Sequence, residues 1–183
     1  MTGEILVKSG LAAIMAGLAA ATPKPVEVKL LNQASGFDSN MSVASVKLAR
    51  SSESWMKIWK EHAIPEVDVR NGASAAVRPA PALPFDKVMV LAVFDGIANP
   101  RRWVLMSSKL DAKKETVTLR IRPENLNPSG LNVNLTPYTF LFFNRTNAHV
   151  VIEAPDRDGF VPIAEFPKIE PPKDPSVPPP TGE

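Results

Sequence analysis

The sequence of 183 residues has no cysteine, only two histidines and no marked excess of either charge. The absence of cysteine excludes thiol catalysis, disulfides and metal centres with cysteine ligands. Two histidines are too few for a histidine-rich metal site within one chain. The 21 basic and 19 acidic residues leave a formal net charge of +2, whereas nucleic-acid binding usually needs a clustered basic surface. We therefore expect no metal and no nucleic-acid partner.

The motifs of common enzyme classes are missing as well: there is no G-x-S-x-G, no phosphate-binding loop and no G-x-G-x-x-G. A serine hydrolase needs a histidine base. His62 falls on the apolar face of an expected helix, half-buried, and His149 opens an expected strand beside a turn. Asp86 and Asp95 flank an expected strand and lie about 20 Å apart, too far for a two-carboxylate glycosidase. We expect a protein that is not an enzyme and has no cofactor.

The sequence does contain a run of seven apolar residues, 88–94, with charged residues or glycine on both sides. A short apolar run bounded by turn signals is typical of a strand that is covered on both faces. A buried helix segment is the alternative, but three valines and a phenylalanine in seven positions favour the strand. We predict that residues 88–94 form a central strand.

One helix is predicted after a serine cap at Ser51 or Ser52, and it should run to residue 61. Its apolar positions follow the spacing i, i+3, i+4 and i+7, which gives one stripe along the helix. These positions are Trp55, Ile58, Trp59 and His62. Aromatic side chains bury a large area, so we interpret the stripe as core packing and not as a ligand platform.

The other expected strands are short and bounded by turn signals; they are residues 26–30, 43–48, 103–108, 116–122, 137–143 and 149–153. Residues 32–42, 64–84, 97–102 and 123–128 are expected loops, the second of them a mobile surface loop. Residues 144–147 should form a tight turn that joins the last two strands. The sequence predicts an α+β fold: a mainly antiparallel sheet of about five to seven strands with one main helix packed on a face.

Both ends of the sequence differ in composition from its middle. Residues 1–21 have the lysine, apolar run and A-x-A site of an export signal; the alternatives are a packed alanine-rich helix and a disordered or mis-started end. The apolar run is too short to span a bilayer. We expect a single domain over residues 22–160 and a disordered proline-rich tail over residues 161–183. The Asp-Arg-Asp-Gly segment at 156–159 lacks most calcium ligands, so we interpret it as a turn.

A binding spot, if the chain has one, is predicted in the loop of residues 96–103 that follows the central strand. Arg101 and Arg102 place two planar cations beside Trp103, where they could stack on a ligand. Asn99 in the same loop and Tyr138 on a later strand complete the candidate set. The alternative is that the basic residues only keep the surface soluble.

Three segments in this order resemble one known family, the PrcB-like C-terminal domain, named after a subunit of a protease complex. Residues 51–62 resemble its capped helix with W-x-x-x-W, residues 85–96 its central strand, and residues 135–143 its late T-x-P-Y/F strand. The match covers residues 43–153. It implies an exported bacterial accessory domain that associates with a protease and is not a catalyst. In place of the family's Thr-Gly-Gly-Tyr turn, residues 99–103 read Asn-Pro-Arg-Arg-Trp.

We therefore expect an exported protein, periplasmic or extracellular, that binds or stabilises a partner protein and does not span a membrane. Two alternatives remain open. The first is an enzyme that acts on a small molecule at residues 96–103. The second is a structural envelope protein in which the proline-rich tail serves as a spacer.

Overall fold

The computed structural model describes residues 27–64, 78–126 and 134–170. The predicted export signal, residues 65–77 of the predicted mobile loop and most of the predicted tail lie outside these ranges. None of the helices in these ranges has the length and apolar character that a membrane span requires.

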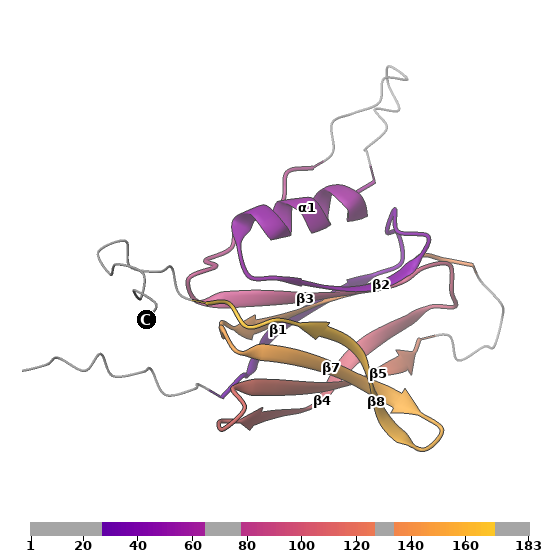
Figure 1. Ribbon diagram of the computed structural model, residues 1–183. Coiled ribbons are helices and arrows are strands. Elements are labelled where there is room, and N and C mark those ends of the chain that lie inside the picture. The colour runs from indigo at the N-terminus through magenta and orange to yellow at the C-terminus, as the bar shows by residue number, and fades with distance from the viewer. Residues whose placement is uncertain (1–26, 65–77, 127–133, 171–183) are drawn as a thin grey trace, which may run out of the picture.

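The described chain forms three layers, with one helix above two stacked sheets (Figure 1). The first sheet has the strand order β1-β6-β3-β2 and the second has the order β4-β5-β7-β8. The elements are β1 (Leu30–Gly36), β2 (Ala44–Ala49), α1 (Ser52–His62), β3 (Val88–Asp95), β4 (Arg101–Asp111), β5 (Thr116–Asn125), β6 (Tyr138–Asn144), β7 (His149–Asp156) and β8 (Gly159–Phe166). Neighbouring strands are antiparallel except β5 and β7, which are parallel.

The prediction that residues 88–94 form a central strand is confirmed. β3 pairs with β2 on one side and with β6 on the other. Met89, Leu91 and Val93 belong to the core between the two sheets. Alternate residues such as Val90 and Phe94 belong to the core beneath α1. Both faces of the strand are therefore buried, which explains its unbroken apolar sequence.

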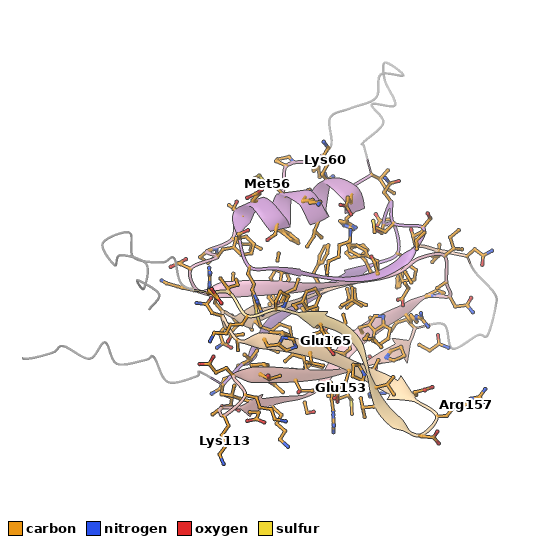
Figure 2. The ribbon with its side chains drawn as sticks, in the orientation of Figure 1. Met56, Lys60, Lys113, Glu153, Arg157 and Glu165 are labelled. Atoms are coloured by element: carbon orange, nitrogen blue, oxygen red, sulfur yellow. The ribbon has the colours of Figure 1, made fainter. Side chains whose placement is uncertain are left out.

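The predicted helix is also confirmed. Ser51 is its N-cap, and its hydroxyl accepts the backbone N–H of Ser54 while the Ser54 hydroxyl accepts the N–H of Ser51. Trp55 is buried, and its indole N–H donates to the Pro81 carbonyl at 2.9 Å. Met56 and Lys60 point away from the sheet (Figure 2). The tryptophan stripe thus packs α1 onto the first sheet, as predicted.

The α+β class is confirmed, but the prediction of one sheet is wrong: within the described residues, eight strands form two sheets. Val117, Leu119 and Ile121 alternate with polar residues on β5, as predicted, and their buried face packs against the first sheet. Alternation shows that one face of a strand is buried, but it does not identify the layer that covers this face. The second sheet keeps its other face in water.

The prediction that residues 144–147 form a tight turn between paired strands is wrong as well, because β6 and β7 belong to different sheets. This connection crosses from one sheet to the other. The Arg145 N–H donates to the Lys87 carbonyl at 2.7 Å. The buried Arg50 guanidinium donates to the carbonyls of Ala148 and Pro167, each at 2.7 Å. These bonds fix the crossing, so a short linker here joins the two layers and does not close a hairpin.

The remaining errors concern strand ends and edge strands. β1 covers part of the predicted loop 32–42, and β8 lies largely beyond residue 160, so the predicted start of the tail is wrong at this point. Both are exposed edge strands, which are held mainly by backbone pairing and leave a weak sequence pattern. Pro162 is tolerated because β8 is an edge strand with a register shift nearby.

β4 and β5 also extend into the predicted loops 97–102 and 123–128. The predicted turn at residues 156–159 is confirmed, since it joins β7 to β8.

Candidate functional site

The predicted binding residues Arg101 and Trp103 contact a carboxylate of the chain itself. The Arg101 guanidinium lies 2.6 Å from Oδ1 of Asp95, and the Trp103 indole N–H donates to the same oxygen at 3.0 Å. The Arg101 guanidinium also lies 5.8 Å from the centre of the Trp103 ring. The Asp95 side chain is 2% exposed. These contacts form a closed unit, which we call the Asp95 cluster.

The loop before β4 is held by its backbone. Gly96 has φ +66°, and a Cβ at this position would lie 2.7 Å from the Ser42 carbonyl oxygen. Ala98 and Leu135 exchange backbone hydrogen bonds at 2.9 and 3.0 Å. Asn99 follows in the same loop and has an interaction of its own. The loop therefore ends β3 and starts β4 in a fixed geometry.

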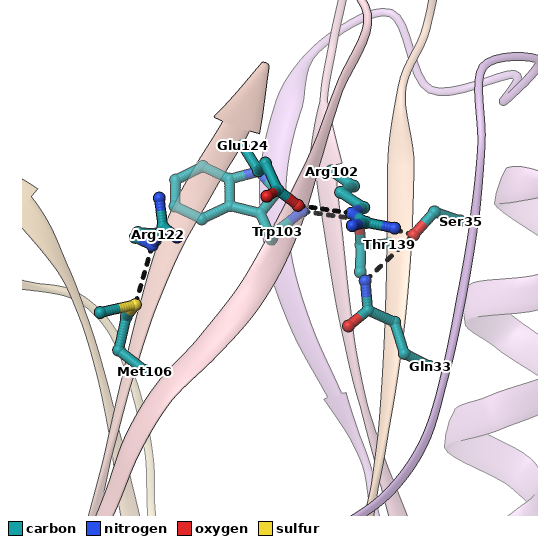
Figure 3. Close-up of polar contacts among 8 residues, drawn as sticks. All are labelled: Gln33, Ser35, Arg102, Trp103, Met106, Arg122, Glu124 and Thr139. Atoms are coloured by element: carbon teal, nitrogen blue, oxygen red, sulfur yellow. Dashed lines mark hydrogen bonds and ion pairs between the residues drawn. The ribbon is translucent and has the colours of Figure 1, made fainter. Parts of the chain in front are cut away.

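Arg102 contacts a different carboxylate. Its Nε donates to Glu124 on β5 at 2.7 Å, as Figure 3 shows. The backbone N–H of Trp103 donates to the Thr139 hydroxyl at 3.0 Å and so links the two sheets. The structure therefore brings together Arg101 and Trp103 of the predicted set, and it leaves Arg102 and Tyr138 elsewhere.

Tyr138 lies at a pocket that the sequence did not identify. The pocket has a volume of about 350 Å³ and opens beside the C-terminal end of α1. It is lined by Asp38, Trp59, His62, Ala63, Ile64, Arg78 and Tyr138. This volume lies at the lower end of the range of small-molecule sites.

Four separate stretches of sequence build this pocket, and one of them contributes Arg78. The last turns of α1 supply Trp59 and His62, and the start of β6 supplies Tyr138. Asp38 follows β1 and forms a bridge with Thr136, where the Ser39 N–H donates to the Thr136 carbonyl at 3.1 Å. The pocket therefore lies where the end of the helix meets the ends of β1 and β6.

His62 is buried, and the prediction that it would be half-buried is wrong: it is 6% exposed. Its Nδ1 lies 3.0 Å from the hydroxyl oxygen of Ser39, which also accepts the Met41 N–H at 3.1 Å. The imidazole centre lies 4.2 Å from the centre of the Tyr138 ring. The hydrogen bond and the ring packing together fix the orientation of the imidazole.

Burial lowers the pKa of His62, and the charge of Asp38 acts in the opposite direction with a smaller effect. Burial also raises the pKa of Tyr138, and Asp38 adds to this increase because an anion disfavours a phenolate. At neutral pH the imidazole is therefore neutral and the phenol protonated. Asp38 and Arg78 are the residues that bring formal charge to the pocket lining.

Two of the aromatic walls are held in place. The Trp59 indole N–H donates to the Arg78 carbonyl at 2.8 Å, and the indole lies 5.4 Å from the imidazole of His62. The Tyr138 ring lies against Gly36, where a Cβ would come within 2.6 Å of it. A larger residue at position 36 would displace the ring. Gly36 is therefore needed for the shape of this wall.

Sequence reasoning grouped Tyr138 with residues 96–103, and it assigned Trp59 and His62 to core packing, whereas in the structure these three residues line one pocket. The missing partner was Asp38, in a stretch predicted to be a plain loop. A short polar run with Asp38, Ser39 and Gly36 was the available signal, but only the pairing of β1 with β6 brings it to the helix end.

The lining of the pocket contains hydrogen-bonding groups, aromatic side chains and a carboxylate. In the described part of the chain, no three histidine or acidic residues gather where they could hold a metal ion. Comparisons of the chain with protein-family models, with curated proteins and with solved structures find no match.

Proposed function

We propose that this chain is an exported, non-enzymatic domain that binds a partner protein at the pocket between the end of α1 and the start of β6. The observation that supports this most is the open pocket itself, with fixed aromatic walls and the exposed carboxylate-bearing residue Asp38. Export is proposed from the signal-like residues 1–21 and from the resemblance to the PrcB-like family.

The rigidity of the walls supports binding. Trp59 is held by the Arg78 carbonyl, and His62 is held by Ser39. A site whose walls are already ordered loses less conformational entropy when it binds a ligand. One side chain of a partner could therefore insert into the pocket at a small entropic cost.

The alternative function is catalysis by a serine nucleophile. It is favoured by one contact, the hydrogen bond between Ser39 and His62 at 3.0 Å. Two facts weigh against a serine nucleophile at this pair. Ser39 is 3% exposed, and its hydroxyl oxygen already accepts the N–H of Met41. A nucleophile must reach its substrate, and the bond from Met41 occupies one of the two lone pairs of the Ser39 oxygen and makes it a weaker nucleophile. We therefore assign the pair to positioning the imidazole.

The enzyme alternative at residues 96–103 has less support. Arg101 and Trp103 already bind Asp95, and Arg102 binds Glu124. A ligand would have to break these contacts before it could use the two cations, and the pocket at Tyr138 requires no such change.

Site-specific photocrosslinking in the natural host tests the proposed function. A benzophenone amino acid is placed at Ile64, which lines the pocket and is 50% exposed. The matched control is Met106, which is 51% exposed and lies on β4 of the second sheet. We expect a discrete adduct with one protein from Ile64 and none from Met106. Equal labelling from both positions, or no adduct from Ile64 at native expression, would contradict the proposal.

A further inference from the structure

We propose that the pocket accepts an alkylammonium group, the side chain of a lysine on the partner protein. This inference rests on the proposed function and specifies the ligand chemistry. It combines three features of the lining: an exposed carboxylate, two aromatic side chains and an apolar rim.

The carboxylate belongs to Asp38, which is exposed. Its backbone is fixed on both sides, because the Thr136 N–H donates to the Phe37 carbonyl at 3.2 Å and the Ser39 N–H donates to the Thr136 carbonyl at 3.1 Å. Asp38 lines the same pocket as His62 and Tyr138, and its charge affects the pKa of both. A cation at the pocket would meet an anion whose position the fold already defines.

The walls beside this carboxylate are aromatic. Trp59 and Tyr138 line the pocket, and each packs against the imidazole of His62, at 5.4 and 4.2 Å between ring centres. The face of an indole or phenol ring attracts a cation, and tryptophan does so most strongly. A neutral His62 does not repel such a cation. Carboxylate and rings together favour an ammonium group over a neutral polar group.

The rim of the pocket suits the stem of a lysine. Ala63 and Ile64 line it, and Ile64 is half exposed. Lysine has a four-carbon stem that packs on apolar surface while its charge stays near water. A lysine can therefore cover Ile64 and still place its ammonium group at Asp38.

The alternative ligand is a carboxylate, which Arg78 would favour. Arg78 lines the same pocket and carries the opposite charge to Asp38, and it has an interaction of its own. Its carbonyl also holds the Trp59 indole. If Arg78 determined the ligand, the pocket would prefer a carboxylate. The two ligand classes are separated by probes of opposite charge.

NMR titration of the full chain tests the inference with the blocked amino acids N-acetyl-lysine methylamide, its uncharged norleucine analogue and its glutamate analogue. The readout is the indole N–H signal of Trp59. We expect saturable millimolar binding of the lysine probe and binding at least fivefold weaker for the other two. Stronger binding of the glutamate probe, or equal binding of lysine and norleucine, would overturn the inference.

Asp38→Asn keeps the shape of the side chain and removes its charge. We expect it to weaken lysine-probe binding about threefold to fivefold, the range of an exposed ion pair. Asp86→Asn removes another exposed carboxylate and should leave binding unchanged. Unchanged binding in Asp38→Asn would overturn the inference.

The two experiments distinguish the inference from the proposed function. If the Ile64 adduct forms while the lysine probe does not bind, only the ligand class is wrong. If the adduct is also missing, the proposed function is wrong.

Discussion

Asp95 and Asp38 each lie beside aromatic and basic residues, yet the fold surrounds them in opposite ways. Asp95 is buried, and Arg101 and Trp103 both bind one of its oxygens. Asp38 is exposed at the rim of a pocket lined by Tyr138. The same residue types therefore build a closed structural unit at one place and an open site at the other.

The difference shows how little residue type alone says about function. Two arginines beside a tryptophan gave the stronger sequence signal, but Arg101 and Trp103 already have partners within the chain. Burial explains this, because a buried charge must be paired or it destabilises the fold. A carboxylate in water has no such requirement, and it can keep its charge for a ligand.

The largest effect is expected from Asp95→Ala. This substitution removes the acceptor shared by Arg101 and Trp103 and leaves both donors without it. Asp95 is buried but Arg101 is 38% exposed, so losing the ion pair together with the Trp103 hydrogen bond is expected to cost about 2 kcal/mol of unfolding free energy. Urea denaturation of the variant and the wild type measures this loss. A loss below about 1 kcal/mol would show that the Asp95 cluster does not hold the end of β3 to β4.

Asp95→Asn serves as the control for charge. The amide oxygen can still accept the Trp103 N–H, but it no longer pairs as an anion with Arg101. The loss should lie between that of the alanine variant and zero. If the asparagine variant were as unstable as the alanine variant, the charge of Asp95 would account for the whole contribution.

The sequence predicted local structure well and tertiary neighbours poorly. The Ser51 cap, the tryptophan stripe and the apolar run 88–94 each follow from residues close in sequence, and each is confirmed. The division into two sheets and the strand β8 depend on which layers pack together and on backbone pairing at an edge. Side-chain patterns encode neither feature.

The candidate site was missed for the same reason. Tyr138 was named from the sequence, but its neighbours Asp38 and His62 come from distant segments. The pairing of β1 with β6 brings Asp38 to the pocket, and β1 has the weak pattern of an edge strand. A site built across an unrecognised edge strand cannot be assembled from sequence motifs.

A smaller effect than that of Asp95→Ala is expected for the pH dependence of stability, to which His62 contributes. Burial lowers its pKa in the folded state below the ordinary value of 6.5, while Asp38 opposes this with a smaller effect and Arg78 also lines the pocket. Between the folded-state pKa and about 6.5 the unfolded chain binds more protons, so stability rises with pH across this window. One proton gives a slope of at most about 1.4 kcal/mol per pH unit. Urea denaturation at several pH values measures it.

His62→Gln should remove this part of the slope, since glutamine does not titrate. His149→Gln keeps the buried imidazole and should retain it. If the stability of the wild type fell as pH rises through this window, and if His62→Gln abolished that fall, the assignment would be contradicted. A fall that persisted in His62→Gln would come from other groups.

The smallest effect is expected from Asp38→Ala, and this variant completes the comparison with Asp95. An exposed side chain without a buried partner contributes little, so the unfolding free energy should change by less than about 0.5 kcal/mol. Urea denaturation beside Asp95→Ala measures both losses under the same conditions. A loss at Asp38 near that at Asp95 would mean that the fold also depends on this carboxylate, and the pocket would then be a second structural unit. A loss near zero would leave Asp38 available for a ligand, which is the condition on which the proposed lysine site depends.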